Sequence, residues 1–166
     1  HVREVLYDPP SLRPAADIDV LIAPHDRIKS TTVLINHGFD AELNRKNINV
    51  EASFVYKGST VDLHWNLFRQ KRAKVNYVEA FLARRVRKKD LYCLNKDDCL
   101  FMMLAHPVFF KYLTGPYAYL SRIVDIYTWI EMHAIDWPYL LRLVQQAHLK
   151  TAAWLTGTYC EMLTGI

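Results

Sequence analysis

Hydrophobic and polar residues follow short, strand-like patterns in the first part of the chain. Residues 17–23 form a β-branched run between two prolines, a pattern that is typical of a buried strand. Residues 50–56 and 60–67 each alternate between apolar and polar positions, and Lys57-Gly58-Ser59 separates them as a turn. These two segments predict the strands of an antiparallel hairpin.

Between the first strand and the hairpin, the spacing of apolar residues changes to that of a helix. The pattern predicts a helix over residues 25–37, with Ile28, Thr32 and Ile35 on one face. A short strand is expected over residues 39–43. The first part of the chain, residues 1–94, is therefore predicted to be an α/β subdomain.

Residues 95–166 show helical spacing almost throughout. Asn95 is expected to cap the first helix, which Pro107 would kink or end. Further helices are expected over residues 117–133 after Gly115-Pro116, from the N-cap Asp136 onward, and from Thr151 onward. The predicted fold class is α+β: a mixed β-sheet with flanking helices, followed by a helical subdomain that begins near residue 95.

Composition narrows the class of protein. The chain has 166 residues, of which 51% are hydrophobic and 23% are charged, and this balance excludes a disordered protein. No apolar stretch reaches the roughly 18–20 residues of a membrane-spanning helix, and no leader peptide is visible. The three cysteines show no CxxC spacing, which excludes a cysteine-based zinc ribbon and favours reduced thiols in the cytoplasm.

The formal net charge of +4 permits a polyanionic ligand without requiring a nucleic acid. Most of the excess of positive over negative charge lies within residues 69–89. Two interpretations of this basic segment stay open: contact with a triphosphate or an RNA, or a solvated surface.

Three acidic residues suggest a more specific chemistry. Asp17 and Asp19 are separated by one residue, so their side chains point to the same face of the first predicted strand. Two carboxylates held this close repel each other unless a hard cation lies between them, and Mg²⁺ prefers oxygen ligands. If the strand that carries Asp62 is a neighbour, three carboxylates converge and can hold two Mg²⁺ ions roughly 3.5–4 Å apart. The alternative is a pair of solvated or capping carboxylates.

Other polar residues near these patterns have two interpretations each. His64 shares a strand face with Asp62, where it could contact a phosphate or a metal, or belong simply to a polar face. Arg122 lies in an otherwise apolar helix, so it needs an anionic ligand or a partner. Asp125, three residues further along, could be that partner in a helix-surface pair.

Four segments resemble motifs of the uncharacterised nucleotidyltransferase family, a bacterial branch of the polymerase-β-like nucleotidyltransferase superfamily. Residues 12–22 (LRPAADIDVLI) resemble its R-x-x-x-D-[IL]-D-[IL]-L-[VI] segment, and residues 61–67 (VDLHWNL) resemble its second acidic strand. Residues 98–106 and 119–126 resemble two of its helices. The resemblance spans residues 7 to about 145.

The resemblance implies a minimal nucleotidyltransferase fold with a C-terminal helical bundle. It also implies a cytoplasmic, Mg²⁺-dependent enzyme that transfers a nucleoside monophosphate from an NTP to an acceptor. The sequence leaves the acceptor open among a small molecule, an RNA and a protein side chain, and no membrane is expected to take part.

The resemblance also assigns roles to residues by matching position. Asp17, Asp19 and Asp62 would be the metal ligands, and Asp62 would also act as the base that takes the acceptor's proton. The residues expected to contact the nucleotide are Arg13, His64 and Arg122.

One departure from the family pattern supports an alternative function. Superfamily members usually carry a Gly-Ser helix start, or in this branch a Lys-Gly segment, that holds the phosphates ahead of the acidic pair. None of the sixteen residues before Asp17 matches it, so the segment either lies upstream or is lost. If it is lost, the chain is a catalytically degenerate member that binds a nucleotide or a partner. That alternative predicts carboxylates that are splayed apart or paired with arginines such as Arg13.

Overall fold

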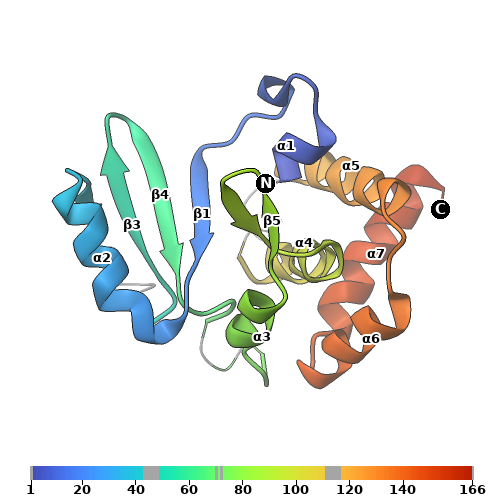
Figure 1. The fold of residues 1–166 in the computed structure, drawn as a ribbon. Coiled ribbons are helices and arrows are strands. Elements are labelled where there is room, and N and C mark those ends of the chain that lie inside the picture. The colour runs from blue at the N-terminus through green and yellow to red at the C-terminus, as the bar shows by residue number, and fades with distance from the viewer. Residues whose placement is uncertain (1, 43–48, 70, 72, 111–116, 166) are drawn as a thin grey trace. The chain divides into compact units, whose positions relative to one another are not determined.

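The computed structural model describes residues 2–42, 49–69, 71, 73–110 and 117–165, which form a mixed α+β structure (Figure 1). The predicted fold class is confirmed. The chain packs as two compact units, each built from more than one segment. One unit contains the β-sheet and comprises Pro14–Arg72 and Asn76–Arg84; the other contains most of the helices and comprises His1–Arg13, Ala73–Val75 and Arg85–Ile166. The division of the chain near residue 95 stays a prediction.

The sheet unit is organised around four strands in the order β1-β4-β3-β2. They are β1 (Asp17–Leu21), β2 (Asp40–Glu42), β3 (Glu51–Tyr56) and β4 (Ser59–His64). β1 runs parallel to β4, whereas β3 pairs antiparallel with both β4 and β2. The predicted hairpin is thus confirmed. Its tight turn is Lys57-Gly58, with φ values of 49° and 80°, and paired positive φ values match the right-handed twist of the strands.

The first strand lies at the edge of the sheet, which corrects the expectation of a buried strand. Within the part of the chain that the structure describes, β1 pairs only with β4. Four of its five residues are exposed, and Ile18 keeps 58% of its surface accessible. A β-branched run indicates a strand, but it does not reveal whether the strand has one neighbour or two.

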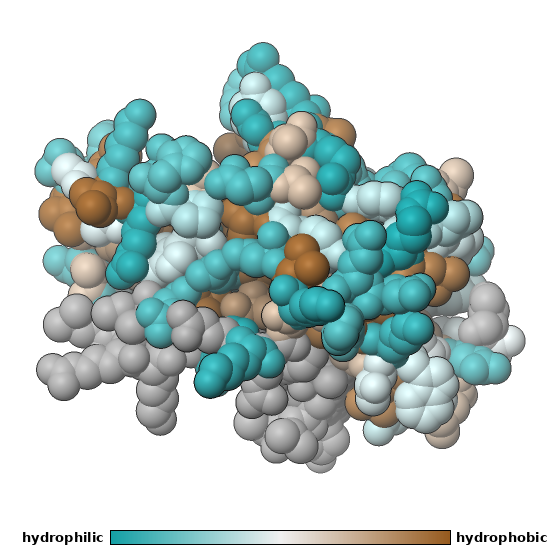
Figure 2. Space-filling model, turned by 90° about the horizontal axis from the view of Figure 1, so that it is seen from below, coloured by the Kyte–Doolittle hydropathy of each residue, from teal (hydrophilic) through white to brown (hydrophobic). Residues whose placement is uncertain are grey.

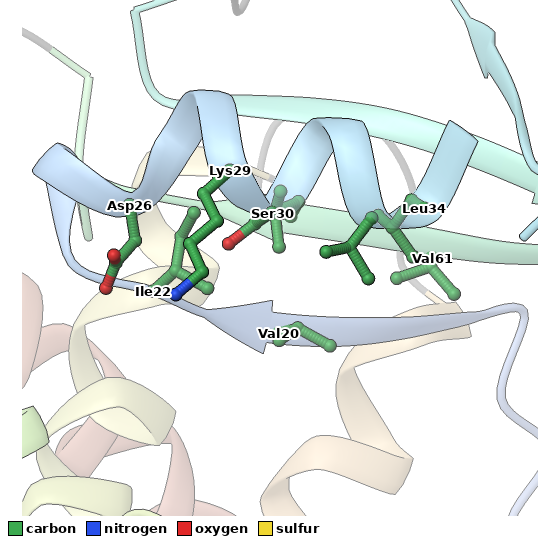
Figure 3. A pocket seen from close by; sticks show the side chains of 9 residues that line it. Val20, Ile22, Asp26, Lys29, Ser30, Leu34 and Val61 are labelled. Atoms are coloured by element: carbon green, nitrogen blue, oxygen red, sulfur yellow. The ribbon is translucent and has the colours of Figure 1, made fainter. Parts of the chain in front are cut away.

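Helix α2 (Arg27–Asn36) follows β1 after a 3₁₀ turn, η2 (Pro24–Asp26), and lies over one face of the sheet (Figure 3). A largely apolar hollow of about 350 Å³ separates the helix from β1 and β4, and Val33 and Leu34 line it from the helix side. The side of the helix that carries Ile28 and Ile35 is the exposed one, because Ile28 is 81% exposed and Ile35 is also exposed. Both sides of the helix carry apolar residues, so the periodicity of the sequence alone could not show which side faces the sheet.

Helix α3 (Val78–Ala83) completes this unit. Its Val78 and Phe81 are buried, as are Phe54 and Leu63 of the sheet. The segment after β4 adds Trp65, Leu67 and Phe68 to the buried residues. The opposite face of the sheet carries the polar positions of the alternating strands.

The helical unit contains α4 (Lys96–Phe110), α5 (Tyr117–Met132), α6 (Trp137–Gln146) and α7 (Lys150–Thr164). Helices α5, α6 and α7 each pack on α4. The predicted caps are confirmed: Asn95 accepts hydrogen bonds from the amides of Asp97 and Asp98, and Asp136 accepts one from the amide of Tyr139. α4 continues past Pro107, so this proline does not end the helix. The expected helix start at Gly115-Pro116 lies outside the described residues.

Shorter elements that the sequence patterns did not predict complete the helical unit. They are α1 (Val2–Leu6), the 3₁₀ turn η1 (Pro10–Leu12), and a hairpin of β5 (Val86–Lys88) and β6 (Leu91–Cys93). No described helix combines the length and hydrophobicity that spanning a membrane requires. On the face shown in Figure 2, hydrophobic side chains are interspersed among hydrophilic ones.

Candidate metal centre

The pairing of β1 with β4 brings the predicted acidic residues onto one face of the sheet. The parallel register places Asp19 directly opposite Asp62, and Asp17 opposite Thr60. On the other side of β4, Ser53 and Glu51 of β3 lie opposite Asp62 and His64. Because side chains alternate along strands, all these positions share the face away from the apolar hollow. The expectation that the Asp62 strand neighbours the first strand is therefore met.

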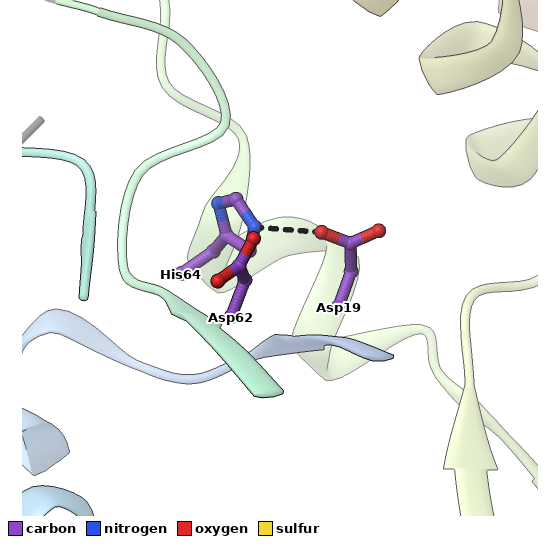
Figure 4. Close-up of side chains that lie close together, drawn as sticks. All are labelled: Asp19, Asp62 and His64. Atoms are coloured by element: carbon purple, nitrogen blue, oxygen red, sulfur yellow. Dashed lines mark hydrogen bonds and ion pairs between the residues drawn. The ribbon is translucent and has the colours of Figure 1, made fainter. Parts of the chain in front are cut away.

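His64 lies between the carboxylates of Asp19 and Glu51, and Figure 4 shows its contact with Asp19. Its Nε2 atom is 2.9 Å from Oδ1 of Asp19, and its Nδ1 atom is 3.2 Å from Oε2 of Glu51. The side chains of His64 and Glu51 are only 16% and 14% exposed, whereas that of Asp19 is largely exposed. The ring is therefore held in one orientation, with one nitrogen directed at each acid.

The acidic surroundings change the protonation of this histidine. Burial by itself would lower the pKa of His64, because it disfavours the charged imidazolium. The hydrogen bond to Asp19 and the negative charges of Asp19, Glu51 and Asp62 together outweigh burial and raise the pKa above its ordinary value of 6.5. The site thus favours positive charge at the position of the ring.

Asp62 has an unusual environment for a carboxylate. Its Oδ1 atom is buried, and no hydrogen-bond donor among the described residues reaches it. A buried carboxylate oxygen without a donor costs about 1–3 kcal/mol, so such oxygens are rare in folded proteins. A cation or a donor supplied by a ligand would satisfy it.

The residues present fit a divalent cation. Asp19, Asp62 and His64 each offer one ligand atom, and these atoms all lie within 4.8 Å of one another. Two carboxylates and one imidazole are ligands that divalent cations accept, and one of these carboxylates, that of Asp62, has an oxygen without a hydrogen-bond donor among the described residues. Asp17 lies on the same face but outside this group, so its role as a ligand stays a prediction.

Glu51 was missed by the analysis of the sequence. It lies on the polar side of an alternating strand, and the hairpin register pairs it with His64. The signal was present in the alternation of both strands. The two-residue turn sets the register that brings Glu51 beside His64. The sequence pattern instead suggested a turn of three residues.

Two other predicted site residues, Arg13 and Arg122, belong to the helical unit. Arg13 forms a bidentate ion pair with Asp125, in which Nε, at 3.1 Å, and Nη2, at 2.9 Å, both donate to Oδ2. The hydroxyl of Tyr7 donates to Oδ1 of Asp125 at 2.6 Å. Asp125 is buried, so the alternative of a surface pair between Arg122 and Asp125 was wrong. The nucleotide contacts expected of Arg13 and Arg122 stay predictions.

Part of the basic segment forms the β5–β6 hairpin. Its residues from Arg84 to Tyr92 are exposed, and the guanidinium of Arg85 lies 4.7 Å from the centre of the Tyr92 ring. The interpretation as a solvated surface and the interpretation as a contact for triphosphate or RNA both remain predictions.

The chain was compared with known proteins. A family model described as "Uncharacterised nucleotidyltransferase" matches residues 1–165. The comparisons with curated proteins and with solved structures gave no significant match. The match extends over nearly the whole chain and includes the strands that carry Asp19 and Asp62. The chain therefore belongs to the uncharacterised nucleotidyltransferase family.

Proposed function

We propose that this chain transfers a nucleoside monophosphate from an NTP to an acceptor, and that Asp19 and Asp62 form the core of its metal centre. The observation that carries the proposal is the buried, unsatisfied oxygen of Asp62 on the strand beside Asp19. An acid in this position destabilises the fold when it has no partner. A role in holding a cation and its substrate explains why such an acid is kept.

A divalent cation bound there, Mg²⁺ on the sequence prediction, would neutralise charge on the triphosphate and lower the pKa of the attacking hydroxyl. Asp19 and Asp62 would hold it, and Asp17 would extend the same acidic face toward a second ion. The acceptor oxygen would form a bond to the α-phosphorus while the bond to the leaving pyrophosphate breaks. Asp62 would take the proton of the acceptor hydroxyl on a carboxylate oxygen.

The alternative function, a degenerate nucleotide- or partner-binding protein, predicted splayed carboxylates or pairing with Arg13. The register instead supports convergence, because Asp19 and Asp62 are directly opposite each other on adjacent strands. The bidentate partner of Arg13 is Asp125, in the helical unit. These two observations favour the enzyme.

A thermal-shift titration with Mg²⁺ and each NTP tests the proposal. Ligand at about 100 times its Kd should stabilise the wild type by about 2.7 kcal/mol, which is an easily measured shift. The Asp19→Asn variant should lose the Mg²⁺-dependent part of the shift, because it loses a metal ligand. Asp40→Asn, the same substitution at an exposed position of β2, serves as the matched control and should behave as the wild type does. An equal shift in all three proteins would contradict the proposed metal centre.

A further inference from the structure

The environment of His64 points beyond a site made only of carboxylates. We propose that His64 is a ligand of the cation through Nε2, that Glu51 positions its ring, and that the site therefore selects Mn²⁺ over Mg²⁺. This inference rests on the proposed function, because it concerns the cation of the same centre. It assigns a role to Glu51 and a metal preference that the family membership does not supply.

The first support is the arrangement of the two ring nitrogens. A cation would displace the proton of Nε2, the atom next to Asp19, and Nδ1 would keep its proton directed at Glu51, so that the lone pair of Nε2 faces the cation. A carboxylate that holds the far nitrogen of a metal-binding histidine fixes the tautomer and the ring orientation. Glu51 is suited to this task because its side chain is as well buried as that of His64.

The second support is the distance between the two atoms that would be neighbouring ligands of the cation. Nε2 of His64 and Oδ1 of Asp19 are 2.9 Å apart. Two ligands at right angles around a small divalent cation, each about 2.1 Å from it, are separated by about 3 Å. The hydrogen bond between these two atoms thus already gives them the spacing of adjacent metal ligands. The ligand atom of Asp62 lies within 4.8 Å of both.

The third support is the chemistry of the donor set. Mg²⁺ strongly prefers oxygen ligands and usually keeps several waters, whereas imidazole nitrogen suits first-row transition metals. Mn²⁺ accepts carboxylate oxygens as Mg²⁺ does and also tolerates a nitrogen ligand. A centre with two carboxylates and one imidazole is therefore expected to bind Mn²⁺ more tightly.

Mn²⁺ titrations followed by electron paramagnetic resonance test this inference on the full chain without nucleotide. The wild type should bind Mn²⁺ at least tenfold more tightly than Mg²⁺, measured by competition. His64→Gln keeps an oxygen donor but loses the nitrogen, so it should weaken Mn²⁺ binding about tenfold or more and leave Mg²⁺ binding within about threefold. Glu51→Gln should weaken Mn²⁺ binding by about 10–100-fold, as other partners of metal-binding histidines do.

Two controls distinguish direct binding of the metal by His64 from the general effects of a lost charge or of altered folding. Glu42→Gln removes the same charge from an exposed position of β2 and should leave both affinities unchanged. The spin-echo modulation of bound Mn²⁺ should change when the histidines carry ¹⁵N, and this change should be absent in His64→Gln. These spectra report the ligand directly, so they do not depend on activity.

The outcomes distinguish this inference from the function on which it rests. Mn²⁺ that binds in an Asp19-dependent way but shows no histidine-dependent modulation would overturn the role of His64 and leave the metal centre standing. Mn²⁺ and Mg²⁺ binding of equal strength would overturn the selectivity. A wild type that binds neither ion would contradict both the inference and the proposed function.

Discussion

At the scale of single residues, Asp62 is the residue on which the proposed function depends most. Its buried Oδ1 atom has no donor among the described residues, while Asp19 and Glu51 place further negative charge nearby. Folding must therefore overcome desolvation and repulsion at this position, which the attraction of His64 offsets in part. Sites that sacrifice stability in this way are characteristic of function, because selection for stability alone would remove them.

The first prediction concerns the stability of the chain without metal. Asp62→Asn removes a buried oxygen that has no donor, but it also removes the attraction of Asp62 for the protonated ring of His64, so the free energy of unfolding in EDTA should change by no more than about 1 kcal/mol. The same variant should lose all stabilisation by added divalent cation. Urea unfolding with and without cation measures both effects.

Asp98 provides the matched control for this prediction. It is fully buried like the critical oxygen of Asp62, but it accepts hydrogen bonds from Nδ2 of Asn95 and from the hydroxyl of Tyr139. Asp98→Asn should therefore cost about 1.5–3 kcal/mol of stability, because it weakens satisfied bonds to a charged group. If Asp62→Asn destabilised the protein as much as Asp98→Asn, Asp62 would have a structural role and not the proposed one.

At the scale of elements, the β3–β4 turn sets the register on which the site depends. Gly58 has a φ of +80°, a conformation that an L-residue adopts only at a cost, although open space surrounds the position of its missing Cβ. Shifting this register by one residue would turn Asp62 and His64 toward the opposite face.

The second prediction follows from comparing two glycines with open surroundings. Gly58→Ala should lower the free energy of unfolding by about 1 kcal/mol because of backbone strain alone. Gly157 lies inside helix α7 without a positive φ, and a Cβ there would meet nothing within 4 Å. Gly157→Ala should therefore raise stability by about 0.5–1 kcal/mol. Denaturant unfolding of both variants checks the opposite signs, and effects of the same sign would show that strain in the turn is not the cause.

The sequence predicted those elements whose signals are local. The alternation of residues 50–56 and 60–67 predicted the hairpin, and the capping side chains of Asn95 and Asp136 predicted two helix starts. The edge position of β1 and the side of α2 that lines the hollow were not predictable in this way. Both depend on which elements pack together, and local patterns do not contain that information.

At the scale of the whole molecule, the N-terminal segment is bonded to a helix more than 100 residues away in sequence. Tyr7 and Arg13 both bond to Asp125 of α5, with partners 118 and 112 residues apart. Helix α1 has only five residues, too few to be stable alone, so packing on α5 must hold it. Sequence spacing suggested Arg122 as the partner of Asp125, because it compares only residues that lie near each other in the chain.

The third prediction concerns the dependence of stability on pH. Burial and the hydrogen bond to Asp125 raise the pKa of Tyr7 from 10.0 to about 12. A raised pKa in the folded state means that the stabilisation is complete below pH 10 and is lost as the pH rises toward about 12. The stability difference between wild type and Tyr7→Phe should therefore shrink across this window. Urea unfolding from pH 9 to 12 measures it, and a constant difference would contradict the contact with Asp125.

The acidic pair and the histidine of the candidate site were predictable from strand alternation, but their convergence was not. It required β1 to pair with β4, which are separated by α2, β2 and β3 in the chain. The resemblance to nucleotidyltransferases predicted this convergence before the fold was known. Glu51 entered the site only through the register of the hairpin.

The most direct test of the central claim is the position of a bound cation. Crystals of the protein with Mn²⁺ and a non-hydrolysable NTP, measured at the manganese absorption edge, would locate the ion by its anomalous scattering. The proposed metal centre predicts a peak within bonding distance of the carboxylates of Asp19 and Asp62, with the triphosphate beside it. Mn²⁺ and nucleotide bound elsewhere, with these two carboxylates unliganded, would contradict the claim.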